Sequence, residues 1–195
     1  MISATTDART EPTRLAPRTP AEREEMERLG ILRPSGATGP SPVHPEDRPP
    51  LERRAVSAPS VLNEAHSYQK PSSFSRALAF DVGGASMMLI SGTASVDEEG
   101  NTVHVGDFRG QLWRTFRNIT ELLRAEDMTW KDIVRTTCYI RDIERDYEEF
   151  NEVRTQFYEW LGLDPLPAST AIQARICRSD LLVEIEAIAV RPHAR

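Results

Sequence analysis

Hydrophobic and polar residues follow two different periods after residue 71, and together they predict an α+β domain. Apolar residues at helical spacing predict two helices, and runs rich in β-branched and aromatic residues predict strands. The strands are expected at residues 74–80, 87–93, 133–141, 169–176 and 177–190, and the helices at 107–124 and 145–160. Two helices can cover only one face of a mixed sheet of about five to six strands, so the other face needs a partner, and self-association is the simplest one.

The last predicted strand has two faces of different chemistry. Every second residue from Leu181 to Ala189 is apolar, which is typical of a strand packed on a core. The opposite face carries Glu184 and Glu186 among aliphatic side chains. Such a face predicts a subunit interface or a cleft that holds a carboxylate, where burial raises the pKa of a Glu towards the range useful for proton transfer. The alternative is an exposed strand face of mixed composition.

The chain changes in composition near residue 71. Residues 1–71 hold eleven of the fourteen prolines and no Phe or Trp, whereas 72–195 hold all six Phe and all three Trp. So little apolar mass cannot offset the entropy lost when a chain becomes ordered. We therefore expect residues 1–71 to be a largely disordered N-terminal extension and 72–195 to be the folded domain.

One part of the extension carries helix signals. Thr19 as N-cap, Pro20 at the first helical position and Glu22 as the capping-box partner predict a short helix over residues 20–29, before Gly30. We expect this helix to be solvated or to dock on the folded domain or on a protein partner.

The net charge lies in the predicted domain. Residues 1–71 carry ten basic and ten acidic side chains, and residues 72–195 carry fourteen and twenty, so the domain accounts for the net charge of −6. An acidic domain without a basic stripe binds phosphate backbones poorly, and nucleic acid is not expected as a partner. No apolar run is long enough for a membrane span, and residues 1–7 lack a signal-peptide core, which predicts a cytoplasmic protein with no membrane partner.

Cysteine and histidine residues give no indication of a metal centre. Cys138 and Cys177 lie inside predicted strands, without a pairing framework or metal-ligand spacing, so free thiols are expected. The four histidines are scattered, which argues against a zinc site built from neighbouring ligands, and we expect no cofactor.

Several short motifs, together with the element order, resemble the Rid (reactive intermediate deaminase) superfamily. The motifs are Phe74-Ser75-Arg76-Ala77, Ile90-Ser91-Gly92-Thr93-Ala94, Gln111 with Asn118, Phe150-Asn151-Glu152, and Val183-Glu184-Ile185-Glu186-Ala187-Ile188-Ala189. The resemblance covers essentially all of residues 72–195. It implies a chorismate-mutase-like α+β fold assembled as a homotrimer with clefts between subunits. In the deaminase branch it also implies cofactor-free hydrolysis of enamines or imines to keto acids and ammonia.

Two positions depart from that branch. The resemblance places a substrate-binding Arg where this chain has Ala168, and a Tyr where it has Phe74. Loss of the guanidinium removes the bidentate partner of a substrate carboxylate. Ordinary deamination of a 2-aminoacrylate-type substrate is therefore in question.

A second resemblance, to the C-terminal catalytic domain of the chorismatases, lies in three segments. They are Ile90-Ser91-Gly92-Thr93-Ala94-Ser95, Val103-His104-Val105-Gly106-Asp107 and Ile176-Cys177-Arg178-Ser179-Asp180-Leu181-Leu182-Val183-Glu184. In that group the resemblance implies that a Glu at the position of Glu184 donates a proton and that the residue at the position of Cys177 shapes the outcome. The present chain lacks the N-terminal half of those enzymes.

Glu184 is the first candidate for a general acid or base. Arg76 and Arg175 are candidates to replace the missing guanidinium, and the alternative for each is an ordinary surface Arg. Ser91 and Gly92 are expected to line the cleft with backbone groups.

Each remaining candidate has a structural alternative. Asn151 is expected to form a polar wall or to brace its helix, and Cys177 is a reactive thiol or a packed strand residue.

These observations predict a trimeric Rid-like domain that performs acid/base chemistry on a small unsaturated carboxylate, by hydrolysis of an enamine or imine in a specialised pathway. One alternative is a chorismatase-like enzyme that cleaves an enolpyruvyl ether. Another is a non-catalytic ligand-binding or scaffold trimer, in which the N-terminal extension contacts a partner.

Overall fold

The computed structural model describes residues 17–32 and 51–193. A short helix, α1 (Pro20–Arg28), lies in the first of these ranges, and a compact unit that starts at Leu51 occupies the second. No helix among the described residues is long and apolar enough to cross a membrane.

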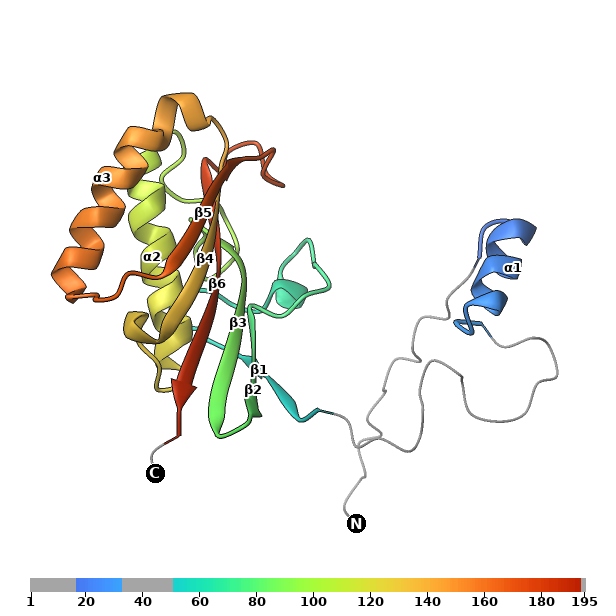
Figure 1. The fold of residues 1–195 in the computed structure, drawn as a ribbon. Coiled ribbons are helices and arrows are strands. Elements are labelled where there is room, and N and C mark those ends of the chain that lie inside the picture. The colour runs from blue at the N-terminus through green and yellow to red at the C-terminus, as the bar shows by residue number, and fades with distance from the viewer. Residues whose placement is uncertain (1–16, 33–50, 194–195) are drawn as a thin grey trace, which may run out of the picture. The chain divides into compact units, whose positions relative to one another are not determined.

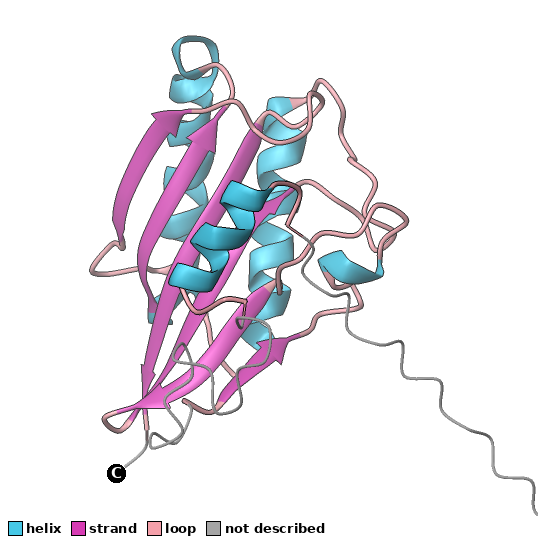
Figure 2. Ribbon diagram, turned by 90° about the vertical axis from the view of Figure 1, so that its right-hand side faces the viewer, coloured by secondary structure: helices cyan, strands magenta, loops and turns pink. Residues whose placement is uncertain are grey.

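The compact unit is built on one six-stranded mixed sheet. Its strands are β1 (Arg53–Val56), β2 (Ala77–Val82), β3 (Ala85–Ala94), β4 (Ile133–Ile140), β5 (Ala168–Gln173) and β6 (Val183–Pro192). Their spatial order is β1-β2-β3-β6-β4-β5, and every neighbouring pair is antiparallel except the parallel pair β4 and β5. The helices α2 (Phe108–Arg124) and α3 (Ile143–Leu161) lie together on one face of this sheet (Figures 1 and 2). The predicted α+β architecture is confirmed.

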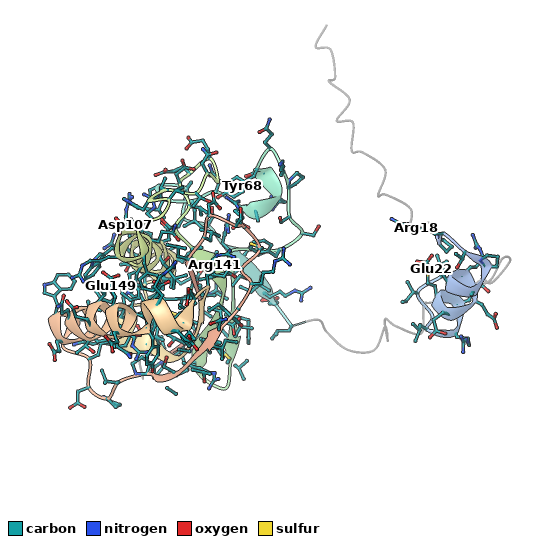
Figure 3. The ribbon with its side chains drawn as sticks, turned by 90° about the horizontal axis from the view of Figure 1, so that it is seen from above. Arg18, Glu22, Tyr68, Asp107, Arg141 and Glu149 are labelled. Atoms are coloured by element: carbon teal, nitrogen blue, oxygen red, sulfur yellow. The ribbon has the colours of Figure 1, made fainter. Side chains whose placement is uncertain are left out.

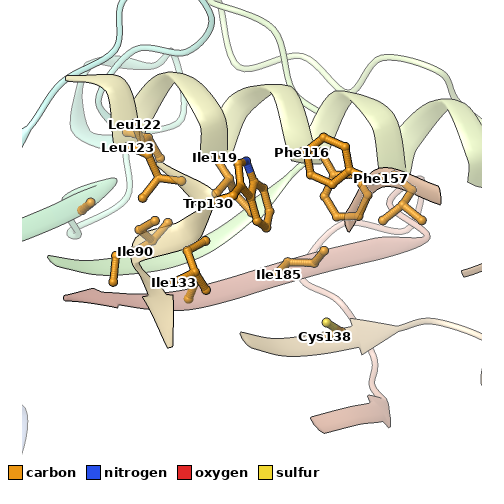
Figure 4. Close-up of a cluster of buried hydrophobic side chains, with 14 of the residues drawn as sticks. Ile90, Phe116, Ile119, Leu122, Leu123, Trp130, Ile133, Cys138, Phe157 and Ile185 are labelled. Atoms are coloured by element: carbon orange, nitrogen blue, oxygen red, sulfur yellow. The ribbon is translucent and has the colours of Figure 1, made fainter. Parts of the chain in front are cut away.

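The core fills the space between the two helices and the sheet (Figure 4). In β6 the apolar positions Val183, Ile185 and the two alanines that follow at period two are buried, as the alternation predicts. Phe116 of α2 stacks on Phe157 of α3 with ring centroids 4.5 Å apart. Trp130, in a 3-10 turn before β4, meets both rings edge-on, so aromatic packing joins the helices above the sheet.

Local signals set the ends of several elements. Asp107 caps α2 by accepting a hydrogen bond from the Gly110 N–H at 2.9 Å. Gly83 and Gly84 join β2 to β3 with φ angles of 58° and 84°, which only glycine adopts at low cost, and this confirms the expected hairpin turn.

The predicted start of the folded domain at residue 72 is wrong. β1 pairs with β2 from Arg53 opposite Phe80 to Val56 opposite Ala77. Val56, Val61, Leu62 and Ala65 are each at most 2% exposed, and the segment therefore contributes to the core. The absence of Phe and Trp was a poor guide, because small aliphatic side chains bury well against a sheet edge.

The predicted disorder of residues 1–16 and 33–50 lies outside the described residues. The helix expected at 20–29 is confirmed as α1. The Thr19 hydroxyl accepts from the Glu22 N–H at 3.1 Å, and the Glu22 carboxylate accepts from the Arg18 N–H rather than from that of Thr19. No residue of α1 is buried.

The expected continuation of β5 to residue 176 and the start of the last strand at 177 are also wrong. Residues 174–182 form a loop held by Arg141, which directly follows β4 and is labelled in Figure 3. Its guanidinium donates hydrogen bonds to the carbonyl oxygens of Ile176, Arg178 and Leu181. This long-range contact replaces the strand pairing that the local sequence favours.

Candidate active site

The sheet is irregular where β3 meets β6. Ile90 pairs with Ala187 and Thr93 with Ile185, so two residues of β3, Ser91 and Gly92, face a single residue of β6. Such a bulge re-aims the neighbouring side chains. The next pair along the two strands is Ala94 of β3 and Glu184 of β6. The Glu184 carboxylate points over the bulge.

Gly92 leaves room for this close approach. A Cβ atom at this position would lie 2.0 Å from Oε1 and 2.9 Å from the carboxyl carbon of Glu184. The bulge and the missing side chain therefore create the space that the Glu184 carboxylate occupies.

A cavity of about 330 Å³ opens above the bulge. Its walls come from β3 and β6, from the loop between Ala65 and Arg76, and from the loop before β6. The structure thus brings together six of the nine predicted site residues, namely Phe74, Arg76, Ser91, Gly92, Cys177 and Glu184.

The cavity is rich in positive charge. Lys70, Arg76 and Arg178 line it, and among the described residues Glu184 is the one acidic residue in its lining. The chain as a whole carries a net charge of −6. A cationic hollow in an acidic protein attracts small anions.

Glu184 is half-buried and its pKa is raised. Burial is the largest cause, because it penalises the charged carboxylate, and the negative charge of Glu186 adds to it. The positive charge of Arg76 acts in the opposite direction. Glu184 therefore keeps its proton to higher pH than an exposed Glu, as a general acid requires.

Ser91 and Phe74 have different roles in the cavity wall. The Ser91 hydroxyl donates to the Ser75 carbonyl at 2.8 Å, and its N–H donates to the Arg76 carbonyl at 3.0 Å. Ser91 thus ties β3 to the chain entering β2. Phe74 is 42% exposed, and its ring lies beside the Arg76 guanidinium.

Three predicted residues lie outside the cavity. Arg175 is exposed and lines a second hollow of about 250 Å³, which shares Glu184 and Cys177 with the first. Ala168 is exposed at the start of β5, and β4 separates that strand from β6. Asn151 lies on α3, where its side-chain oxygen accepts a hydrogen bond from Arg154 at 2.6 Å. Asn151 therefore braces its helix and is not a wall of this cavity.

The two cysteines differ in environment. Cys138 is buried in β4, as predicted, and burial raises the pKa of its thiol. Cys177 lies in the loop held by Arg141 and is exposed, which corrects its expected place in a strand. Both are free thiols.

Among the cavity residues that the sequence interpretation did not predict, Tyr68, Lys70 and Arg178 carry aromatic or charged side chains. Tyr68 and Lys70 fall in the segment that was expected to be disordered, where an isolated Tyr among polar residues was the available signal. Glu186, the second acidic residue of β6, lines a separate hollow of about 220 Å³ with Arg135. Within residues 17–32 and 51–193, no group of three or more His, Cys, Asp or Glu side chains could hold a metal ion.

Comparisons with known proteins cover most of this region. A model of the endoribonuclease L-PSP family matches residues 68–191. A RutC family protein of Pyrococcus horikoshii is 30% identical over 104 residues, which cover 53% of this chain and 79% of the relative. The 3-aminoacrylate deaminase RutC of Acinetobacter baylyi is 27% identical over 103 residues, which cover 53% of this chain and 78% of that protein.

Solved structures agree with the fold. A chorismatase structure is similar with a TM-score of 0.60 and 27% identity, and the match covers 71% of this chain and 44% of the chorismatase. This chain therefore corresponds to less than half of that enzyme. TdcF of E. coli matches with a TM-score of 0.58 and 24% identity, over 71% of this chain and 98% of TdcF, and shows the fold alone.

Proposed function

Because this chain belongs to the endoribonuclease L-PSP (YjgF/Rid) family, we propose that it is an acid/base enzyme that hydrolyses an enamine or imine of a small unsaturated carboxylate. One observation carries the proposal: the half-buried Glu184, whose pKa is raised, lies over Gly92 in a cavity lined by three cations. A protonated carboxyl and an anion-binding wall are the two groups that such a reaction needs.

The proposed reaction uses Glu184 twice. Its carboxyl first protonates the carbon of an enamine and gives an iminium ion, which is the better electrophile. Water then adds to the iminium carbon while the Glu184 carboxylate takes a proton from it. The resulting carbinolamine expels ammonia and leaves a keto acid, so that enamine and water give keto acid and ammonia.

We also propose that the active form is a homotrimer. The face of β6 that α2 and α3 do not cover carries Ile188 and Val190, both half-buried in the single chain. A face of this composition is stabilised by contact with another copy. Light scattering during size-exclusion chromatography should give three times the chain mass of 22.0 kDa, and a monomer at micromolar concentration would contradict this assembly.

The test of the reaction is a mass-resolved time course. Imines generated in place from amino acids would be incubated with wild type, Glu184→Gln and Glu186→Gln. We expect wild type to speed imine loss, Glu184→Gln to abolish this effect, and Glu186→Gln to retain most of it, because Glu186 lines a different hollow and burial, the largest cause of the raised pKa of Glu184, remains. Equal activity of wild type and Glu184→Gln would refute the assigned acid.

A chorismatase-like reaction is the second candidate, since Cys177 and Glu184 line the same cavity and the chorismatase structure resembles this fold. Chorismate belongs in the same time course for this reason. Consumption of chorismate alone would assign cleavage of an enolpyruvyl ether instead of deamination. No turnover of any of these compounds would favour a ligand-binding or scaffold trimer.

A further inference from the structure

Arg76, at the entrance to β2, is buried in an unusual way. Arg76 is only 7% exposed, yet it lines the cavity. The centre of its guanidinium lies 5.1 Å from the centroid of the Tyr68 ring and 5.3 Å from that of the Phe74 ring. Its Nε donates a hydrogen bond to the Asn63 carbonyl at 3.0 Å. Two rings and a carbonyl thus hold the guanidinium in one orientation.

The two outer nitrogens of this guanidinium have no acceptor among the described residues. In the part of the chain that the structure describes, neither Nη group of Arg76 donates a hydrogen bond, and Arg76 forms no ion pair. Neither Nη atom is among the buried unpaired polar atoms of the described residues, so both Nη groups are open to the cavity, where a ligand can reach them. The two Nη groups of an Arg match the geometry of a planar carboxylate, which binds with two parallel hydrogen bonds.

The segment from Val61 to Tyr68 keeps Arg76 in place. Glu64 accepts a hydrogen bond from the Arg76 backbone N–H at 3.3 Å, while Arg114 of α2 donates to the Val61 carbonyl at 2.9 Å. The Tyr68 ring lies against Gly100, where a Cβ atom would be 2.6 Å from the ring. Apart from Tyr68 itself, this segment precedes the part of the chain that matches the family model.

We propose that Arg76 is the carboxylate anchor of the cavity and that residues 61–68 are the device that positions it. Arg76 thereby replaces the guanidinium that the family resemblance places at Ala168. The ligand is an organic acid whose carboxylate contacts Arg76 and whose reactive end faces Glu184. This inference deepens the proposed function and rests on it for the reaction, but binding of the carboxylate is measurable without turnover.

The first experiment compares an anion with its uncharged counterpart. Ligand-observed NMR titrations would use crotonate and crotonamide with wild type, Arg76→Gln, Arg175→Gln and the control Arg117→Gln, which alters an exposed Arg on α2. We expect wild type to prefer crotonate and Arg76→Gln to bind it about tenfold or more weakly, the effect of losing one charge-assisted hydrogen-bonded pair. Arg175→Gln and Arg117→Gln should bind as wild type does.

The second experiment tests the positioning. Tyr68→Phe keeps a ring beside Arg76, whereas Tyr68→Leu removes it. We expect Tyr68→Leu to weaken crotonate binding several-fold in wild type and to have no effect in Arg76→Gln, with Tyr68→Phe close to wild type in both. Thermal denaturation of each variant identifies any that fails to fold, and if Tyr68→Leu does not fold, the comparison of Arg76→Gln with wild type still tests the anchor.

Several results would overturn the proposal. They are equal affinity of wild type for crotonate and crotonamide, unchanged binding by Arg76→Gln, or loss of binding in Arg175→Gln alone. Failure of the proposed reaction is distinguishable from these. If Glu184→Gln shows no turnover but still binds crotonate in an Arg76-dependent way, the assignment of Arg76 as the anchor stands. If wild type shows no turnover but binds crotonate in this way, only the proposed reaction is refuted.

Discussion

Gly92→Ala tests whether the Glu184 carboxylate owes its position to the missing side chain. The added Cβ would lie 2.0 Å from Oε1, and ordinary contact begins at 3.4 Å, so the carboxylate must move by about 1.4 Å. The φ angle of Gly92 is outside the left-handed region, and alanine is therefore allowed there. A Gly→Ala change at such a site ordinarily stabilises a protein by about 0.4–1 kcal/mol.

The clash should offset that gain. Moving Glu184 away from its preferred rotamer costs about 0.5–1.5 kcal/mol. The free energy of unfolding of Gly92→Ala should therefore lie within about 1 kcal/mol of the wild-type value. In a Glu184→Ala background the clash is absent, and the same change should stabilise by about 0.4–1 kcal/mol. The coupling free energy between the two positions is then about 0.5–1.5 kcal/mol.

Urea denaturation followed by tryptophan fluorescence measures this cycle, with all four proteins at one concentration because association changes apparent stability. Equal effects of Gly92→Ala in both backgrounds would refute the reasoning, since they would show that the two residues do not compete for space. In the imine assay, displacement of the acid by about 1 Å should lower turnover on the order of 100-fold although the variant stays folded.

Three further predictions concern other parts of the structure. Because burial raises the pKa of Glu184, ionisation of this carboxyl disfavours the folded state. Glu184→Gln should therefore have a higher melting temperature than wild type at neutral pH, and this difference should vanish below the unfolded pKa of about 4.3. A constant difference in melting temperature across pH would contradict this prediction. Leu62→Ala should cost about 2–5 kcal/mol in urea denaturation because Leu62 is 1% exposed, whereas a disordered segment predicts no change. Iodoacetamide labelling followed by mass spectrometry should modify Cys177 well before the buried Cys138, and equal rates would contradict their assigned environments.

Local patterns predicted the parts of the fold that local forces determine. The alternation in the last strand placed Glu184 on the face opposite the core, and Gly83-Gly84 marked the turn between two strands. Helical spacing found α2 and α3 within two residues of their ends. Each of these elements buries a face that its own sequence defines.

Contacts between distant residues decided the rest. The loop before β6 exists because Arg141 binds its carbonyl groups, and no feature of residues 174–182 alone shows this. The core contribution of residues 56–65 depends on β1 pairing with β2. Ala168 and Asn151 entered the predicted site because of the motif resemblance. A motif match identifies corresponding positions in two sequences, but it does not show which contacts a residue makes in this structure.

Strand β1 also protects the sheet. Without β1, β2 would be an edge strand, and its backbone N–H and C=O groups beside the buried Ala77 and Ala79 would be unpaired. Such groups can pair with a strand of another molecule and cause aggregation. β1 is only four residues long, and it turns two arginines towards solvent. One of them, Arg54, is bound to Glu126 and fixed there. Because the edge strand β1 is short and carries arginines, strands of other molecules pair with it poorly. Loss of β1 would therefore reduce solubility before it destabilised the fold.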